Sequence, residues 1–155
     1  MKEKLLVRIA TRDDADNIAK FNVRFAKSTI DKNVPMQVTA KGVHSVFAKF
    51  NNGFYLVAEL EKQIVGITMI TREWSDWNNG AYYCIQGIFV NHNANEKSIH
   101  DSIYEKAKSL AKEHDDVCGL RLYVHGDDKE TQNLYENLGM TKTPYRIFEE
   151  DFGGD

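Results

Sequence analysis

The sequence predicts a mixed α/β domain built on one central sheet, with the element order β-α-α-β-β-β-α-β-α-β. Tyr82–Val90 is rich in aromatic and β-branched residues, which favour strands. Beyond this strand, apolar residues recur at helical spacing, at Ile99, Ile103, Ala107 and Leu110. Apolar and polar residues then alternate over Leu120–His125, which indicates a half-buried strand. A strand, a helix and another strand in succession predict a parallel pair, while the earlier strands are expected to form an antiparallel meander.

The first third of the chain is predicted to hold one strand and two helices. Leu5–Ala10 is the first predicted strand. Thr11 with Asp14 three residues later forms the acidic variant of a capping box, which starts a helix. Apolar residues at helical spacing define the buried face of this helix and of a second one that follows Thr39. These residues are Ile18, Phe21 and Phe25 in the first helix, and Val43, Val46, Phe47 and Phe50 in the second. A proline predicts a loop over Asp31–Met36.

The middle of the chain is predicted to form an antiparallel hairpin followed by a loop. A turn at residues 51–53 precedes two apolar runs, Phe54–Leu60 and Ile64–Thr71, which are expected to pair as strands. The polar segment Arg72–Gly80 carries two tryptophans and is expected to be a loop that leads into the next strand.

The C-terminal part is predicted to add one helix and one strand. The helix covers Glu130–Leu138 and ends at Gly139, because glycine readily adopts the left-handed conformation of a helix cap. Tyr145–Glu149 follows a proline and is the last predicted strand of the sheet. We therefore expect one domain over residues 1–151, with residues 152–155 as a loose tail.

Composition argues against several classes of protein. The chain has 155 residues, of which 42% are hydrophobic and 28% are charged, as in an ordinary globular domain. A net charge of −3 argues against nucleic acid as the main partner. The first apolar run is too short for a signal sequence or a membrane span, so a cytoplasmic protein with no membrane partner is expected. The five histidines lack ligand spacing, so no metal site is predicted. Cys84 and Cys118 have apolar neighbours and are expected to be buried free thiols.

Several stretches of this sequence resemble the GNAT superfamily of N-acetyltransferases. The strand Ile85–Val90 and the segment Asn133–Met140 carry the resemblance most clearly. Gly119–Val124, Tyr145–Glu149 and the loop Trp74–Trp77 are similar to one branch of the superfamily. The resemblance covers nearly the whole chain and implies the fold of that superfamily.

The resemblance implies a wedge-shaped site between two splayed parallel strands, Gly87–Val90 and Leu120–Val124. There the chain would move an acetyl group from acetyl-CoA to a primary amine. The backbone of Ile88 and Val90, with Phe89 between them, would hold the pantetheine arm of the cofactor. The N–H near Ile88 would stabilise the oxyanion that forms at the thioester.

The resemblance also assigns a general acid, whereas the general base stays open. Tyr135 matches the family tyrosine that protonates the departing thiolate, and a phenol with a pKa of about 10 suits a thiol with a pKa of about 8.5. The alternative role for Tyr135 is packing of the short helix. The position that often carries the base is Gln86, which cannot accept a proton in this role. Glu59, Glu73 and Asp76 are the candidates that remain.

The cradle for the pyrophosphate of the cofactor departs from the family pattern R/Q-x-x-G-x-G/A. Its positions, counted from Val90, are Asn95, Glu96, Lys97, Ser98, Ile99 and His100. Side chains at three of these positions would fill space that the family leaves for phosphate oxygens. The carboxylate of Glu96 can oppose an anion about 4 Å away by up to about 4 kcal/mol. Asp128 and Thr131 replace an asparagine and an alanine near the CoA. We therefore expect the affinity for acetyl-CoA to be weakened.

Aromatic and acidic residues suggest where the amine acceptor binds. Trp74, Asp76, Trp77, Tyr82 and Tyr145 are the candidates for an acceptor pocket. Aromatic residues in a polar loop favour binding, although packing of a hairpin explains them equally well.

Three functions are compatible with the sequence. The first is an N-acetyltransferase that acts on a primary amine of a small molecule or peptide. The second is a catalytically inactive member of the same fold, retained as a binding or regulatory module. The third is a dimeric partner-binding protein that uses the sheet edge near Tyr145–Glu149, so a homodimer is left open.

Overall fold

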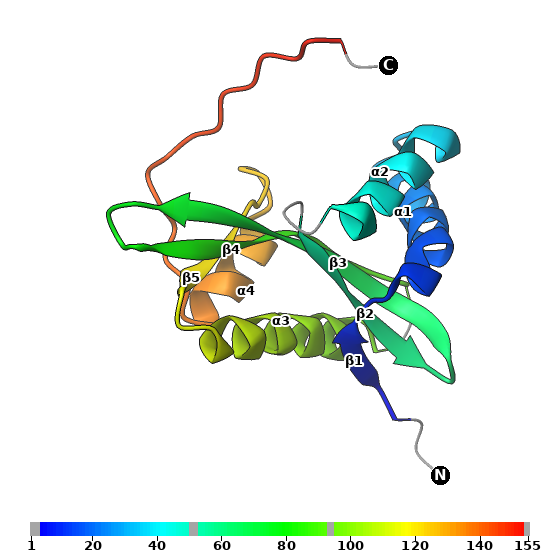
Figure 1. Cartoon of the computed structure of the whole chain (residues 1–155), viewed down its shortest axis with the longest axis horizontal. Helices are drawn as coiled ribbons and strands as arrows, with labels where there is room; N and C mark the ends of the chain where they lie inside the picture. The colour runs from blue at the N-terminus through cyan, green and yellow to red at the C-terminus, as the bar shows by residue number, and fades with distance from the viewer. Residues whose placement is uncertain (1–3, 50–52, 93–94, 154–155) are drawn as a thin grey trace. The chain divides into compact units, whose positions relative to one another are not determined.

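One mixed sheet of five strands, in the order β1-β2-β3-β4-β5, organises the fold (Figure 1). The computed structural model describes residues 4–49, 53–92 and 95–153. The strands are β1 (Leu6–Ile9), β2 (Phe54–Leu60), β3 (Gln63–Ser75), β4 (Gly80–Val90) and β5 (Val117–Leu122). The pairs β1–β2, β2–β3 and β3–β4 are antiparallel, while β4 and β5 are parallel. The predicted α/β class with a mixed sheet is therefore confirmed.

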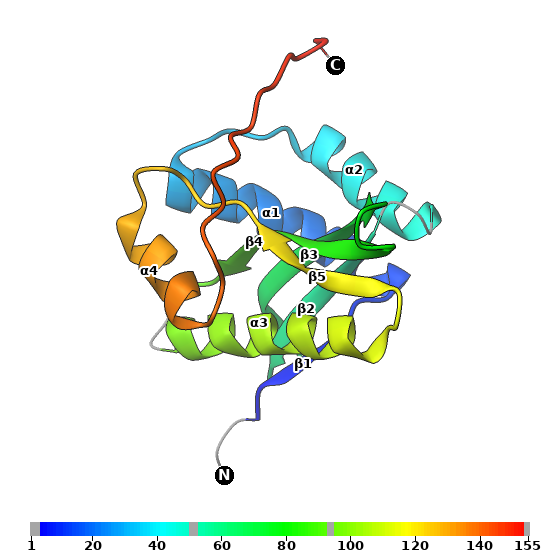
Figure 2. The same cartoon turned by 90° about the vertical axis from the view of Figure 1, so that its left-hand side faces the viewer.

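Helices cover both faces of the sheet (Figure 2). They are the 3-10 turn η1 (Arg12–Asp14), α1 (Ala15–Ile30), α2 (Met36–Ala48) and α3 (Glu96–Glu113). Buried residues of α1 and α2 pack with Val57 and Ile67 on one face. Ile99 and Ile103 of α3 pack with Ala58 and Val90 on the other face. Among the described helices, none has the length and apolar character needed to cross a bilayer.

The chain divides after Leu122 into two compact units. The first unit holds the sheet and the first three α-helices. The second unit begins at Tyr123 and holds α4 (Lys129–Asn137). Gly139 follows α4 with a φ of +97°, so the predicted glycine cap of this helix is confirmed.

The predicted strand at Tyr145–Glu149 is wrong. This segment has no regular secondary structure, and Phe148 is 96% exposed. A strand needs a neighbour that accepts and donates its backbone hydrogen bonds. None of the five strands of the sheet includes this segment, so its alternating apolar residues remain in solvent.

The predicted loop at Arg72–Gly80 is also wrong for most of its length. Strand β3 continues to Ser75, and β4 starts at Gly80, so the turn is confined to residues 76–79. Trp74 pairs with Ala81 in the ladder. Polar residues here extend the hairpin because cross-strand pairing satisfies their backbone groups, whatever their side chains are.

Two element boundaries and the burial of one cysteine differ from the expectation. Helix α2 starts at Met36 rather than after Thr39, because Pro35 has the extended conformation of an N-cap and its carbonyl accepts the Thr39 N–H at 3.0 Å. Strand β5 lies at Val117–Leu122 rather than at Leu120–Val124. On this edge strand Cys118 is exposed, so its predicted burial is wrong, while the free thiol Cys84 is buried as expected. Phe50, predicted to close the α2 stripe, lies outside the described residues.

An ion cluster fixes the start of α1 against the first two strands. Arg8 of β1 donates to both carboxylate oxygens of Asp14, at 2.8 and 2.9 Å, and to Glu59 of β2 at 2.6 Å. The Thr11 N–H donates to Asp14 at 2.7 Å, which confirms the predicted capping contact. The hydrogen bonds from Arg8 and then from Thr11 lower the pKa of Asp14 against the opposing effect of burial.

We expect Asp14→Asn to lower the free energy of unfolding by about 2 kcal/mol at neutral pH, because it breaks a charged pair whose acidic side chain is only 12% exposed. The unfolded pKa of an aspartate is about 3.9, and the folded value lies below it. The contribution of Asp14 is therefore complete at neutral pH and is lost as the pH falls through the folded value. Urea unfolding of both proteins at neutral pH and below about pH 4 tests this, since the difference should shrink in acid.

The matched control is Asp16→Asn, the same change two residues later. Asp16 pairs with His44 at the surface and is 78% exposed, so its loss should cost less than about 1 kcal/mol. Equal losses from the two substitutions would contradict the role given to Asp14.

Candidate active site

Strand β4 reverses the faces of its alternating side chains at a bulge near Gly87. Before the bulge, Tyr83 lies on the α3 face, with its ring 6.4 Å from a histidine ring at the end of α3. After it, Phe89 stacks on Phe25 of α1 at 4.2 Å, and Val90 packs against α3. Odd-numbered side chains thus face α3 before the bulge, and even-numbered ones do so after it. The register between β3 and β4 shifts at the same place, as an inserted residue requires.

Gly87 and Thr68 together hold this bulge. Gly87 has a φ of +100°, a backbone conformation that residues with a Cβ rarely adopt. A Cβ at this position would lie 2.8 Å from a ring carbon of Phe89. On β3, Thr68 is 1% exposed and its hydroxyl donates to the carbonyl of Gly87 at 2.8 Å. The bulge is therefore fixed by a buried hydrogen bond as well as by backbone conformation.

Beyond the bulge, one edge of β4 has no neighbouring strand among the described residues. The parallel pairing of β4 with β5 ends at Ile85 and Leu122, where β5 itself ends. The Asn91 N–H donates to a carbonyl of the preceding β3 strand at 2.9 Å. Successive N–H groups of a strand point to opposite sides, so those of Ile88 and Val90 point away from β3. Two backbone donors therefore face the space beyond the end of β5.

The first turn of α3 lies close behind this edge in the sequence. Asn95 is the N-cap residue, and its carbonyl accepts the Ile99 N–H at 2.9 Å. The first N–H groups of any α-helix lack intrahelical acceptors, so the next three residues offer donors to an anion. The Glu96 carboxylate is 3.5 Å from His92, and His92 in turn is 3.1 Å from the Thr29 hydroxyl of α1. These contacts connect the start of α3 to the end of α1.

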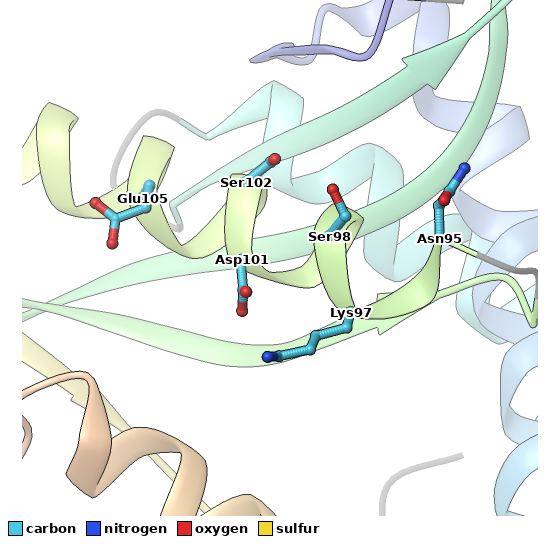
Figure 3. Close-up of a pocket in the computed structure, with 6 residues that line it drawn as sticks. All are labelled: Asn95, Lys97, Ser98, Asp101, Ser102 and Glu105. Carbon is cyan, nitrogen blue, oxygen red and sulfur yellow. The ribbon is translucent and has the colours of Figure 1, made fainter.

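An open pocket of about 510 Å³ lies along the first turns of α3 (Figure 3). It is lined by Asn95, Lys97, Ser98, Asp101, Ser102 and Glu105. Three predicted cradle residues are therefore found together, but two carboxylates outnumber one ammonium, which disfavours phosphate. Of the other predicted cradle residues, Ile99 is part of the core and His100 is half-buried beside Asp101.

Four side chains from three strands meet on the sheet face opposite α3, and we call them the Glu73–Arg121 cluster. They are Glu73 of β3, Tyr82 and Cys84 of β4, and Arg121 of β5. The Arg121 guanidinium lies over the Tyr82 ring at 3.7 Å, and its Nη1 is 3.4 Å from Oε2 of Glu73. The Cys84 thiol donates to the same oxygen at 3.7 Å. Burial, and then the charge of Glu73, raise the pKa of this thiol.

The structure separates the residues predicted for an acceptor pocket. Tyr82 belongs to the Glu73–Arg121 cluster. Trp74 follows Glu73 in β3, and successive side chains of a strand point to opposite faces, so Trp74 lies on the α3 face. Asp76 and Trp77 lie in the turn between β3 and β4, where Trp77 is almost fully exposed. Tyr145 belongs to the extended part of the second unit and is exposed.

The three candidate bases are also in different places. Glu59 is engaged by Arg8 at 2.6 Å in the ion cluster of β1 and β2. Asp76 is in the hairpin turn. Glu73 is two residues from Thr71 on the same face of β3, and the Thr71 hydroxyl accepts a hydrogen bond from the side-chain amide of Gln86 at 2.8 Å.

Two further predicted site residues belong to the second unit. Tyr135 is a buried residue of α4, and its carbonyl accepts the N–H of Met140 at 3.0 Å. Asp128 is the N-cap of α4, and its carboxylate accepts the Thr131 N–H at 3.0 Å. That contact lowers the pKa of Asp128.

Sequence reasoning missed two residues of the candidate site, Thr68 and Arg121. Arg121 alternates with Leu120 and Leu122, so the sequence indicated that its side chain leaves the core face, but not what it meets there. Thr68 carries no local signal, because its partner is nineteen residues away on the next strand.

Comparisons with known proteins show the family to which this fold belongs. The sequence pattern of the acetyltransferase (GNAT) family matches residues 27–140. A possible acetyltransferase from Clostridium difficile 630 is 33% identical, with a TM-score of 0.86 over 95% of this chain and 97% of that chain. The chain therefore belongs to the GNAT family of acetyltransferases.

More distant structures share the fold alone. An aminoglycoside N-acetyltransferase in complex with CoA is 9% identical, with a TM-score of 0.79 over 98% of this chain and 97% of that chain. A ribosomal-protein-alanine N-acetyltransferase from Brucella melitensis biovar Abortus 2308 is 14% identical, with a TM-score of 0.75 over 96% of this chain and 100% of that chain. None of the curated proteins matches the sequence.

We expect Gly87→Ala to lower the free energy of unfolding by about 1–3 kcal/mol, because alanine is strained at this φ and its Cβ meets Phe89. The matched control is Gly42→Ala in α2, where a new Cβ meets nothing within 4 Å and alanine is the better helix former. Urea unfolding should show a loss for the first variant and none for the second. Equal stability of wild type and Gly87→Ala would contradict the role of the bulge.

Proposed function

We propose that the chain transfers an acetyl group from acetyl-CoA to a primary amine of a small molecule or peptide. The observation that supports this function most directly is the open edge of β4, toward which the N–H groups of Ile88 and Val90 point. Membership of the GNAT family supports the same reaction. No separate observation favours the alternative of a catalytically inactive module.

The residues around this edge fit the chemical parts of acetyl-CoA. The pantetheine arm carries amides, which suit the backbone groups of Ile88, Phe89 and Val90. The side chains of Phe89 and Val90 are occupied by packing, so backbone is the part of β4 that a ligand can use. The first turn of α3, with Lys97 in it, offers backbone donors and one positive charge to a pyrophosphate.

Two residues of the chain would have a task in the reaction. Bound acetyl-CoA supplies a thioester whose carbonyl carbon is electrophilic. The Ile88 N–H would donate to the carbonyl oxygen and stabilise the negative charge that develops there. Tyr135 would give its hydroxyl proton to the departing sulfur as general acid. The acceptor amine must be neutral when it attacks, so we expect the rate to rise with pH as the amine loses its proton.

The same proposal includes a weakened affinity for the cofactor. Glu96 adds a negative charge to the first turn of α3, and the pocket beside it is lined by two carboxylates and one ammonium. Like charges near a protein surface oppose each other by up to about 4 kcal/mol at about 4 Å. The residues at positions 95–100 also include no glycine, so the backbone is less accessible to phosphate oxygens than in the family pattern.

Calorimetric titration with acetyl-CoA and with desulfo-CoA tests both statements. We expect the wild type to bind in the high micromolar to millimolar range. Glu96→Gln should tighten binding by up to about tenfold at low salt, and less at high salt, because it removes only charge. The double variant Glu96→Gly with Ser98→Gly should bind more tightly still.

The matched control for this titration is Glu113→Gln, the same change at the other end of α3, which should leave the affinity as it is. A low micromolar wild-type affinity would contradict the weakened cradle. The absence of heat at millimolar ligand would contradict the use of acetyl-CoA.

We expect Tyr135→Phe to lower kcat by about 10²-fold or more, because the leaving thiolate loses its proton donor. The affinity for desulfo-CoA should stay the same, which separates catalysis from binding. Release of the CoA thiol measures the rate, and Tyr123→Phe, an exposed tyrosine of the same unit, is the control. An unchanged rate in Tyr135→Phe would remove this residue as the acid.

A further inference from the structure

The Glu73–Arg121 cluster holds the guanidinium of Arg121 in one orientation on the sheet face opposite α3. The Arg121 guanidinium lies 3.7 Å from the centroid of the Tyr82 ring, and one of its nitrogens is 3.4 Å from Glu73. Asn78 donates to the Tyr82 hydroxyl at 3.1 Å, which fixes the ring beneath the guanidinium. The Cys84 thiol fixes the carboxylate of Glu73 in the same way. The orientation of Arg121 is therefore determined before any ligand arrives.

Arg121 keeps the capacity to bind a ligand anion. Its side chain is 46% exposed, and a guanidinium has five N–H donors arranged as a planar fork. Within the described ranges, its ion pair is with Glu73 alone. An exposed pair of this length contributes little to folding. The N–H groups of the guanidinium that do not contact Glu73 suit a carboxylate, because a carboxylate binds a guanidinium through two parallel hydrogen bonds.

The second arginine of this region is arranged differently. Arg72 lies on the α3 face above Tyr83, and its guanidinium is paired with Asp116. It therefore resembles Arg121 in its chemistry and lies on the opposite side of the sheet. This makes Arg72 the matched control for a role of Arg121 in binding.

The distance from Arg121 to the bulge limits the length of the ligand. Arg121 is level with Cys84 in the parallel ladder, and Cys84 precedes Ile88 by four residues. The bulge inserts one residue between them, so their partners on β3, Thr71 and Thr68, are only three residues apart. A strand rises about 3.4 Å per residue, so the two points are about 10 Å apart along the sheet. An acceptor amine at Ile88 and a carboxylate at Arg121 would therefore belong to an extended molecule, about as long as four peptide residues.

We propose that Arg121, held between Tyr82 and Glu73, binds a carboxylate of the acceptor, and that the acceptor is the amino terminus of a peptide with an acidic side chain near its fourth residue. This assignment rests on the proposed acetyl transfer at Ile88. It makes Arg121 a residue that determines specificity, while the chemistry stays at the β4 edge. Lysine would keep the charge at this position but would lose the planar fork.

Two short peptide amides, identical except for Glu or Gln at the fourth residue, test the proposal with the full chain. Acetylation by acetyl-CoA should be about tenfold more efficient, in kcat/KM, for the Glu peptide, with the difference mostly in KM. Arg121→Gln should abolish this preference, and Arg121→Lys should restore only part of it. Moving the Glu to the second residue should reduce the preference of the wild type. Arg72→Gln should keep the preference as it is in the wild type.

Calorimetric binding of the same two peptides separates this proposal from the proposed function. If no amine is acetylated, acetyl transfer fails, but tighter binding of the Glu peptide that depends on Arg121 still supports the carboxylate site. Equal affinity and equal kcat/KM for the two peptides in the wild type would overturn the site. An equal loss with both peptides in Arg121→Gln would also overturn it, because that result indicates a purely structural role.

Discussion

The inserted residue at the β4 bulge is the constraint on which the rest of the structure depends. Gly87 supplies the backbone conformation, and Thr68 fixes it from β3. Because the alternation of side chains reverses there, one strand can give Cys84 to the face opposite α3 and Val90 to the α3 core. A regular strand would direct Phe89 away from Phe25. In the observed structure, β4 stays paired with β3 beyond the bulge, whereas its pairing with β5 ends before it.

Packing on the sheet also determines which part of it a ligand can reach. Helix α1 packs over the sheet beyond the bulge, through Phe25 and Phe89. Its start is held on the same face by the ion cluster of Arg8, Asp14 and Glu59, near the β1 edge of the sheet. The half-exposed Arg121 therefore remains accessible on the same face. The part of this face beyond the bulge is therefore covered by α1, whereas the part before the bulge keeps an exposed arginine.

Local signals in the sequence predicted the helices and most of the strands, and pairing explains what they missed. The spacing of Ile99 and Ile103 identified α3, because helical periodicity depends on near neighbours. Tyr145–Glu149 has the alternation of a strand, but a strand also needs a partner, which sequence does not encode locally. In the same way, the approach of Glu73 and Arg121 depends on two ladder registers. The strands that neighbour β4 were predictable, whereas the registers that decide which side chains meet were not.

The two cysteines of the chain differ in a way that is useful for labelling. The thiolate is the reactive form of a thiol, and Cys84 is both buried and shifted toward its protonated form by its surroundings. Cys118 is exposed on the edge strand β5. A maleimide fluorophore would therefore react at Cys118 first and would give a single reporter on β5, three residues from the guanidinium of Arg121, without any engineered cysteine.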